Sequence, residues 1–202
     1  MFIQVIKGRI ADAGQLRAAL DRWVDELSAG APGWLGTTAG VTDDGTFVNL
    51  ARFESEEAAR ANSGRPEQHQ WWMETSKLLS GDVVFHDSGE VVSFLGGGSD
   101  EAGFVQVIEG RTRDVNRMRE LNDLYEAQFE DFRSDVLGGV AALYGDGAFT
   151  QAIYFTSEAA AREGERKQPP AELKALFDEE MALYEGDLVF YDLRDPWLLS
   201  PR

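Results

Sequence analysis

Two histidines, His69 and His86, are the side chains best suited to move protons near neutral pH in this chain. His69 lies in the segment RPEQHQWW, and on a helix it would share a face with Trp72 and Arg65. It is either a general base or ligand contact beside an aromatic wall, or a partly exposed residue that covers Trp72. His86 interrupts the apolar segment VVFHD, where it either enters a pocket or points to solvent. Both are candidate catalytic residues, and Arg65 is a candidate ligand contact.

Amide and aromatic side chains could complete a small-molecule site. Gln4 and Asn49 lie in apolar segments, and an amide is costly to bury there without a hydrogen-bond partner. They either donate hydrogen bonds to a substrate oxygen, or form hydrogen bonds with neighbouring backbone groups or with groups across the interface between the two sheets. Trp71 and Trp72 are adjacent, so on a helix one fills the core while the other lines a pocket or an interface. Tyr191 is a further candidate for ligand binding.

The composition excludes several other classes of site. The chain has no cysteine, which excludes disulfides, thiolate metal sites and cysteine nucleophiles, and two histidines are too few for a multi-histidine metal site. We therefore predict no metal. A net charge of −17, from 36 acidic and 19 basic residues, disfavours nucleic acid and anionic membranes as partners. No signal-peptide pattern and no long apolar run is present, which predicts a cytoplasmic protein.

The elements that must position these residues are duplicated. The segment FIQVIKGR, which starts at Phe2, recurs as FVQVIEGR from Phe104, an offset of 102 residues. The later segment GDVVFHD recurs as GDLVFYD, which puts Tyr191 at the position of His86. The duplication predicts two domains, residues 1–95 and 104–202, joined by a Gly-rich linker at 96–103.

Each copy shows the same order of predicted elements. Those of the first copy are a strand at 2–9, a helix through Leu16–Leu27, strands at 34–42 and 46–53, a helix after Ser55, a second helical piece from Pro66 to Leu79, and a strand at 82–87. The class is α+β, and the β-α-β-β-α-β order is ferredoxin-like. Both faces of each predicted sheet are largely apolar. We therefore expect helices on one face and the sheet of the other copy on the second, as an intrachain pseudo-dimeric α/β barrel.

The end of the chain is apolar. Trp197, Leu198 and Leu199 either dock on their own domain or support further self-association of an otherwise monomeric pseudo-dimer.

On these residues the sequence resembles the dimeric α/β-barrel superfamily, in its antibiotic-biosynthesis-monooxygenase-like branch. The segments that carry the resemblance are FIQVIKGR, FVNLARFESEEAAR, RPEQHQWWME and GDVVFHD. The resemblance implies a cofactor-independent monooxygenase that acts on a small aromatic or polyketide-like substrate in an apolar pocket. It would use a general base and donors to the developing oxyanion. His69 or His86 would be the base, and Asn49 and Gln4 the donors.

Two other functions stay open. A non-catalytic ligand-binding or stress-related barrel would hold an apolar or aromatic ligand in the same pocket without turning it over. Haem-degrading relatives carry an asparagine on the first strand, and a tryptophan that precedes an iron-binding histidine on the second helix. Here the first-strand polar residue is Gln4, and Trp71 and Trp72 follow His69. This spacing differs from the haem pattern, so we expect no cofactor and keep haem binding as a third function.

Overall fold

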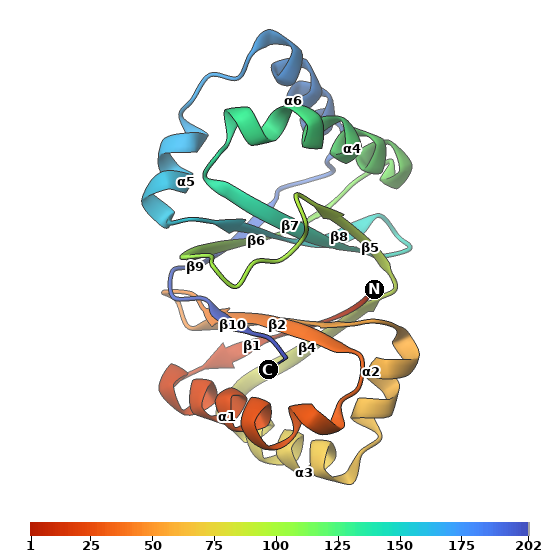
Figure 1. Cartoon of the computed structure of the whole chain (residues 1–202), viewed down its shortest axis with the longest axis vertical. Helices are drawn as coiled ribbons and strands as arrows, with labels where there is room; N and C mark the ends of the chain where they lie inside the picture. The colour runs from red at the N-terminus through yellow and green to blue at the C-terminus, as the bar shows by residue number, and fades with distance from the viewer. Residues whose placement is uncertain (202) are drawn as a thin grey trace. The chain divides into compact units, whose positions relative to one another are not determined.

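The computed structural model describes residues 1–201, apart from the side chains of residues 127–131. The described chain contains two five-stranded sheets, each with three α-helices on one face (Figure 1). Two compact units result: Met1–Glu90 with Asp195–Arg202, and Val91–Arg194. Within the described residues, no helix is both long and apolar enough to cross a membrane.

The first unit follows the predicted element order. Its elements are β1 (Phe2–Ile10), α1 (Ala13–Glu26), β2 (Trp34–Val41), β3 (Thr46–Phe53), α2 (Glu56–Ser63), α3 (Pro66–Thr75), β4 (Leu79–Ser88) and β10 (Trp197–Leu199), with short 3-10 turns at Ser28–Gly30 and Ser76–Leu78. The sheet order is β10-β2-β3-β1-β4. Local signals fix the helix starts: the Asp12 and Ser55 side chains accept hydrogen bonds from backbone N–H groups of α1 and α2, and Pro66 opens α3.

The second unit repeats this arrangement. Its elements are β5 (Glu90–Phe94), β6 (Phe104–Arg111), α4 (Val115–Phe132), β7 (Val136–Leu143), β8 (Ala148–Phe155), α5 (Glu158–Glu165), α6 (Ala171–Leu183) and β9 (Val189–Leu193), in the sheet order β5-β7-β8-β6-β9. The strand register is also repeated, because Phe2 pairs with Phe53 and Phe104 with Phe155. The duplicated ferredoxin-like fold and the α+β class are therefore confirmed.

The fifth strand of each sheet was not predicted. The C-terminal strand β10 pairs with β2 through Trp197 opposite Ala39 and Leu199 opposite Thr37. The segment that follows β4 forms β5, which lies beside β7 in the other sheet. The compact units thus divide the chain differently from the predicted domains: residues 91–94 belong to the second unit and 195–202 to the first. The apolar tail docks on the chain itself, with Trp197 5 % exposed.

The inner strands of the first sheet, β1, β2 and β3, have buried residues on both faces, whereas the edge strand β4 is mostly exposed. The helix-covered face contributes Phe2, Phe47 and Phe53 to a core with α1. On the other face Ile3 and Val48 have no exposed surface. That this second face is covered by the other sheet stays a prediction.

Candidate functional site

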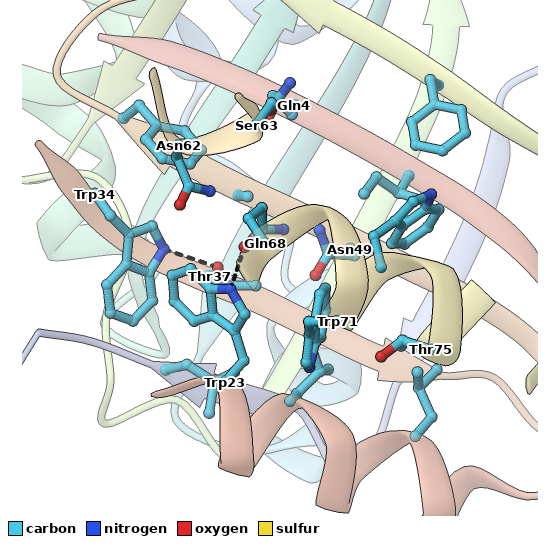
Figure 2. A pocket seen from close by; sticks show the side chains of 18 of the residues that line it. Gln4, Trp23, Trp34, Thr37, Asn49, Asn62, Ser63, Gln68, Trp71 and Thr75 are labelled. Atoms are coloured by element: carbon cyan, nitrogen blue, oxygen red, sulfur yellow. Dashed lines mark hydrogen bonds between the residues drawn. The ribbon is translucent and has the colours of Figure 1, made fainter. Parts of the chain in front are cut away.

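A cavity of about 330 Å³ lies in the first unit between the sheet and helices α1–α3 (Figure 2). Its walls are mainly aromatic and aliphatic. The apolar residues that line it are Ile6, Leu16, Leu20, Trp23, Trp34, Phe47, Ala51, Phe53, Trp71, Trp72, Leu79, Phe85 and Leu199. Cavities of this size and composition are typical of small-molecule sites. The C-terminal strand is part of the wall, because Leu199 reaches the cavity from β10.

Asn49 places an amide in this apolar surrounding. It lies on β3, faces the cavity and is only 5 % exposed. Within the described residues no protein group forms a hydrogen bond with its side chain. Its amide atoms stay accessible through the cavity, where water or a polar atom of a ligand can form hydrogen bonds with them. Asn49 is therefore the strongest indication that the cavity receives a polar atom of a ligand.

Gln4 lines the same cavity but has a partner. It lies on β1 opposite Asp87 of β4, and its Nε2 donates to Asp87 Oδ2 over 3.4 Å. The second unit repeats the pair, with Gln106 Nε2 donating to Asp192 Oδ1 at 2.9 Å. The repetition indicates a bond that holds β1 against the edge strand.

Five further polar side chains in the cavity were not predicted: Thr37, Asn62, Ser63, Gln68 and Thr75. Gln68 Oε1 accepts from the indole N–H of Trp23, and Thr37 Oγ1 accepts from that of Trp34 (Figure 2). A signal for two of them existed in the sequence. Gln68 and Thr75 are seven residues apart on α3, with Trp71 and Trp72 between them, which is the spacing of one helix face.

His69 lies on the exposed side of α3 and lines the cavity. The lining contains no aspartate, glutamate, lysine or arginine, so His69 is its one group that can exchange protons near neutral pH. The cavity is otherwise neutral. The structure brings together five of the predicted site residues: His69, Gln4, Asn49, Trp71 and Trp72.

His86 is not among the residues that line the cavity. It lies on β4 directly opposite Val5, and cross-strand partners share a face of the sheet. Val5 is on the face away from the helices, whereas the neighbouring Phe85 lines the cavity. The alternation of side chains along a strand thus separates His86 from His69.

Arg65 and Tyr191 also lie outside the cavity lining. The Arg65 guanidinium donates to the Leu27 carbonyl at 3.1 Å and to Asn62 Oδ1 at 3.0 Å, which ties the start of α3 to the end of α1. Tyr191 belongs to the second unit, and its hydroxyl donates to Glu109 Oε2 at 3.1 Å. In this structure both residues make contacts within the protein.

The second unit has its own cavity, of about 380 Å³, with different chemistry. Gln151 takes the position of Asn49, but the lining includes charged groups: Arg119, Glu126, Arg133 and Glu180. Burial raises the pKa of Tyr184, and the neighbouring Glu180 carboxylate, which accepts a hydrogen bond from that hydroxyl at 2.6 Å, raises it further. The two copies have therefore diverged into a neutral tryptophan-lined cavity and a charged tyrosine-lined one. In the described part of the chain, no cluster of three or more histidine, aspartate or glutamate residues could hold a metal ion.

Solved structures match the whole chain, although neither a protein-family model nor a curated protein matches its sequence. A candidate monooxygenase from Lactobacillus acidophilus NCFM has a TM-score of 0.71 at 11% identity, over 98% of this chain and 99% of its own. A candidate monooxygenase from Fusobacterium nucleatum subsp. nucleatum ATCC 25586 has a TM-score of 0.74 at 8% identity, over 98% and 94%. An anthrone oxidase-like protein has a TM-score of 0.60 at 13% identity, over 98% and 93%. The chain therefore shares the duplicated ferredoxin-like fold of these three structures.

Proposed function

We propose that the first unit is a cofactor-independent monooxygenase for a neutral, electron-rich aromatic substrate that carries oxygen substituents. The observation that carries the proposal is the Asn49 amide, which is buried in an aromatic cavity and has no hydrogen-bond partner within the described residues. The fold shared with candidate monooxygenases supports the same reaction class.

The lining favours a neutral, flat ligand over a charged one. A charged group would lose its hydration without meeting an opposite charge, because the lining has no carboxylate, ammonium or guanidinium group. Trp23, Trp34 and Trp71 offer ring faces and edges for aromatic contacts, each worth about 0.5–1.5 kcal/mol beyond the buried area. Amide and hydroxyl groups of Asn49, Gln68 and Thr75 would bond to the ligand's oxygens.

The reaction needs no external reductant. His69 takes the proton of a phenol hydroxyl, directly or through water, and the phenolate passes one electron to O₂. The resulting radical pair combines to form a carbon–oxygen bond, and the peroxide takes up the proton. Loss of the hydrogen on that carbon then breaks the oxygen–oxygen bond, so that phenol and O₂ give a quinone and water. Asn49 stabilises the oxyanion that develops on the substrate oxygen.

Oxygen consumption by the purified protein tests the proposal. We would use 1-naphthol and anthrone as probes, the second because one structural neighbour is named anthrone oxidase-like. We expect saturable uptake of O₂ that His69→Ala lowers by about two orders of magnitude, as expected for loss of a general base. His86→Ala is the matched control, because His86 does not line the cavity, and it should leave the rate unchanged. Saturable binding of both probes without oxygen uptake would instead indicate a ligand-binding protein.

Haem binding is separated from this proposal by titration with haemin. The proposal predicts no saturable shift of the haem absorption band. A shift that disappears in His69→Ala would favour the haem-binding function.

A further inference from the structure

Four tryptophans of the first unit form a continuous series of ring contacts. The ring centroids of Trp34 and Trp23 are 4.8 Å apart, those of Trp23 and Trp71 6.4 Å, and those of Trp71 and Trp72 6.3 Å. Trp34 and Trp23 are 5 % and 7 % exposed, whereas Trp71 and Trp72 are half-buried. At the outer end Trp72 contacts the exposed ring of Phe85 at 5.5 Å. All of these rings line the cavity, and the series runs from its buried wall to the half-buried and exposed rings at its outer end.

Indole is among the side chains that lose an electron most easily, and electrons exchange rapidly between rings at contact distance. One-electron oxidation gives an indole radical cation, whose N–H is strongly acidic. Whether this radical cation can oxidise the next ring depends on whether it first loses that proton. A carboxylate acceptor would take the proton and trap a neutral radical on that ring. A hydroxyl, an amide or a peptide carbonyl is too weakly basic to do so, and the charge then stays mobile.

The inner three indoles all have such neutral acceptors. Trp34 donates to Thr37 Oγ1 at 3.0 Å, Trp23 to Gln68 Oε1 at 2.5 Å, and Trp71 to the Ala19 carbonyl at 3.0 Å. Trp72 has no hydrogen-bond partner within the described residues, and its half-buried ring lies where water can take the proton. A radical cation is therefore passed along the inner three rings and is trapped at Trp72, where loss of the proton gives a neutral radical.

We propose that Trp34, Trp23, Trp71 and Trp72 form an electron-transfer path that carries oxidising equivalents from the cavity to the surface. A radical in the cavity takes one electron from an inner indole, and that indole takes one from the next ring. At Trp72 the proton leaves to water, and the neutral radical takes a hydrogen atom from a thiol in solution. Two thiyl radicals then couple to a disulfide. Electron transfer along the four rings does not depend on the proposed function. That the path removes radicals formed during the reaction with oxygen rests on the proposed function.

The second unit supports the assignment by contrast. Residues 91–194 contain no tryptophan, and Tyr125 takes the position of Trp23. All five tryptophans of the chain belong to the first unit, since Trp197 joins it through β10. The path is thus confined to the unit whose cavity holds His69.

A single photo-oxidant placed at the inner end tests the path. The chain has no cysteine, so Leu35→Cys offers one attachment point for a ruthenium polypyridyl label, at an exposed residue next to Trp34. A light flash with a soluble electron acceptor produces ruthenium(III), which takes an electron from Trp34. Peptide mass spectrometry then locates the oxidised tryptophan. We expect oxidation to accumulate at Trp72.

Replacing one tryptophan of the series with phenylalanine should change which tryptophan is oxidised. In a labelled Trp23→Phe variant, oxidation at Trp72 should fall to the level of an unilluminated sample and rise at Trp34, because phenylalanine is far harder to oxidise. Trp71→Phe provides a second break in case Trp23→Phe lowers stability. Trp197→Phe removes a tryptophan of the same unit that lies outside the series, and it should leave the oxidation of Trp72 unchanged. Oxidation of Trp72 that persists in both broken variants, or damage that stays at Trp34 in the intact series, would overturn the path.

Discussion

The indole N–H of Trp23 donates a hydrogen bond of 2.5 Å to Gln68 Oε1, a residue 45 positions later in the chain. The bond joins α1 to α3 in the wall of the cavity and satisfies a donor on a ring that is only 7 % exposed. Gln68 also lines the cavity, so one side chain both supports the wall and adds an amide group to the lining.

Gln68→Leu should lower the stability of the first unit. The substitution leaves the buried Trp23 N–H without an acceptor, which costs about 1–3 kcal/mol. Urea unfolding followed by tryptophan fluorescence measures this for the first unit alone, because all the tryptophans lie there and all the tyrosines lie in the second. Gln70→Leu, at an exposed position of the same helix, is the control and should change stability little. Equal losses in both variants would contradict the role of the bond.

Asn49→Leu should separate binding from stability. Because the side chain has no protein partner in the described structure, its removal should leave the free energy of unfolding unchanged or raise it. Affinity for a phenolic probe should fall by about 1–3 kcal/mol, since the ligand oxygen loses its donor. Quenching of tryptophan fluorescence by 1-naphthol measures this. Gln151→Leu changes the equivalent residue of the second unit and should leave that quenching unaffected.

Asp44 should make the first unit sensitive to acid. Hydrogen bonds from Thr42 and then from Thr46 lower the pKa of its carboxyl from 3.8 to about 2. A lowered folded-state pKa means that the carboxylate contributes stability above the unfolded value, and this contribution is lost as the pH falls from 3.8 to about 2. Thermal unfolding followed by tryptophan fluorescence should therefore show a smaller loss of stability over this window in Asp44→Asn.

The equivalent turn of the second unit is the control for Asp44. Asp146 has a lowered pKa because of its hydrogen bond from Arg111. Asp146→Asn should alter the acid sensitivity seen by tyrosine fluorescence and leave the tryptophan signal as it is. The same effect of both variants on the tryptophan signal would show that the turn does not act locally.

Trp197→Ala should destabilise the first unit from a position at the end of the chain. The ring packs against Phe47 at 6.2 Å and is 5 % exposed, and truncation of such a ring costs about 3–5 kcal/mol. Leu198→Ala, on the neighbouring half-buried residue, should cost much less. Urea unfolding measures both. A loss for Trp197→Ala no larger than that for Leu198→Ala would contradict the role of β10 as part of the first unit.

A chain of these 202 residues should be a monomer in solution. Ile3 and Val48 are fully buried on the sheet face away from the helices, and we predict that the second repeat covers this face within one chain. Native mass spectrometry measures the state directly. A dimer with no monomer would mean that duplication did not replace dimerisation.

The repeat made most of the fold predictable, because the segments that begin at Phe2 and Phe104 pair alike with β3 and β8. The fifth strands were missed for a physical reason. β10 has three residues and pairs with β2, where Trp197 lies opposite Ala39, so no local pattern reveals it.

The site was predictable in part. Asn49, Trp71 and His69 reach the cavity as the segment patterns indicate. The side of the sheet taken by His86 was not predictable, because apolar residues occupy both sides of β4. Only the register of β4 against β1, in which His86 lies opposite Val5, shows that His86 is on the sheet face away from the helices.

Isotope labelling with ¹⁸O₂ measures whether the oxygen atom that the substrate gains comes from O₂. The purified protein, dialysed free of small molecules, would be given 1-naphthol or anthrone under labelled oxygen, and the product analysed by mass spectrometry. We expect one labelled atom in each product molecule, formed by the intact protein and by His86→Ala but not by His69→Ala. Saturable binding with unchanged substrate, or a product whose new oxygen comes from water, would contradict the proposed function.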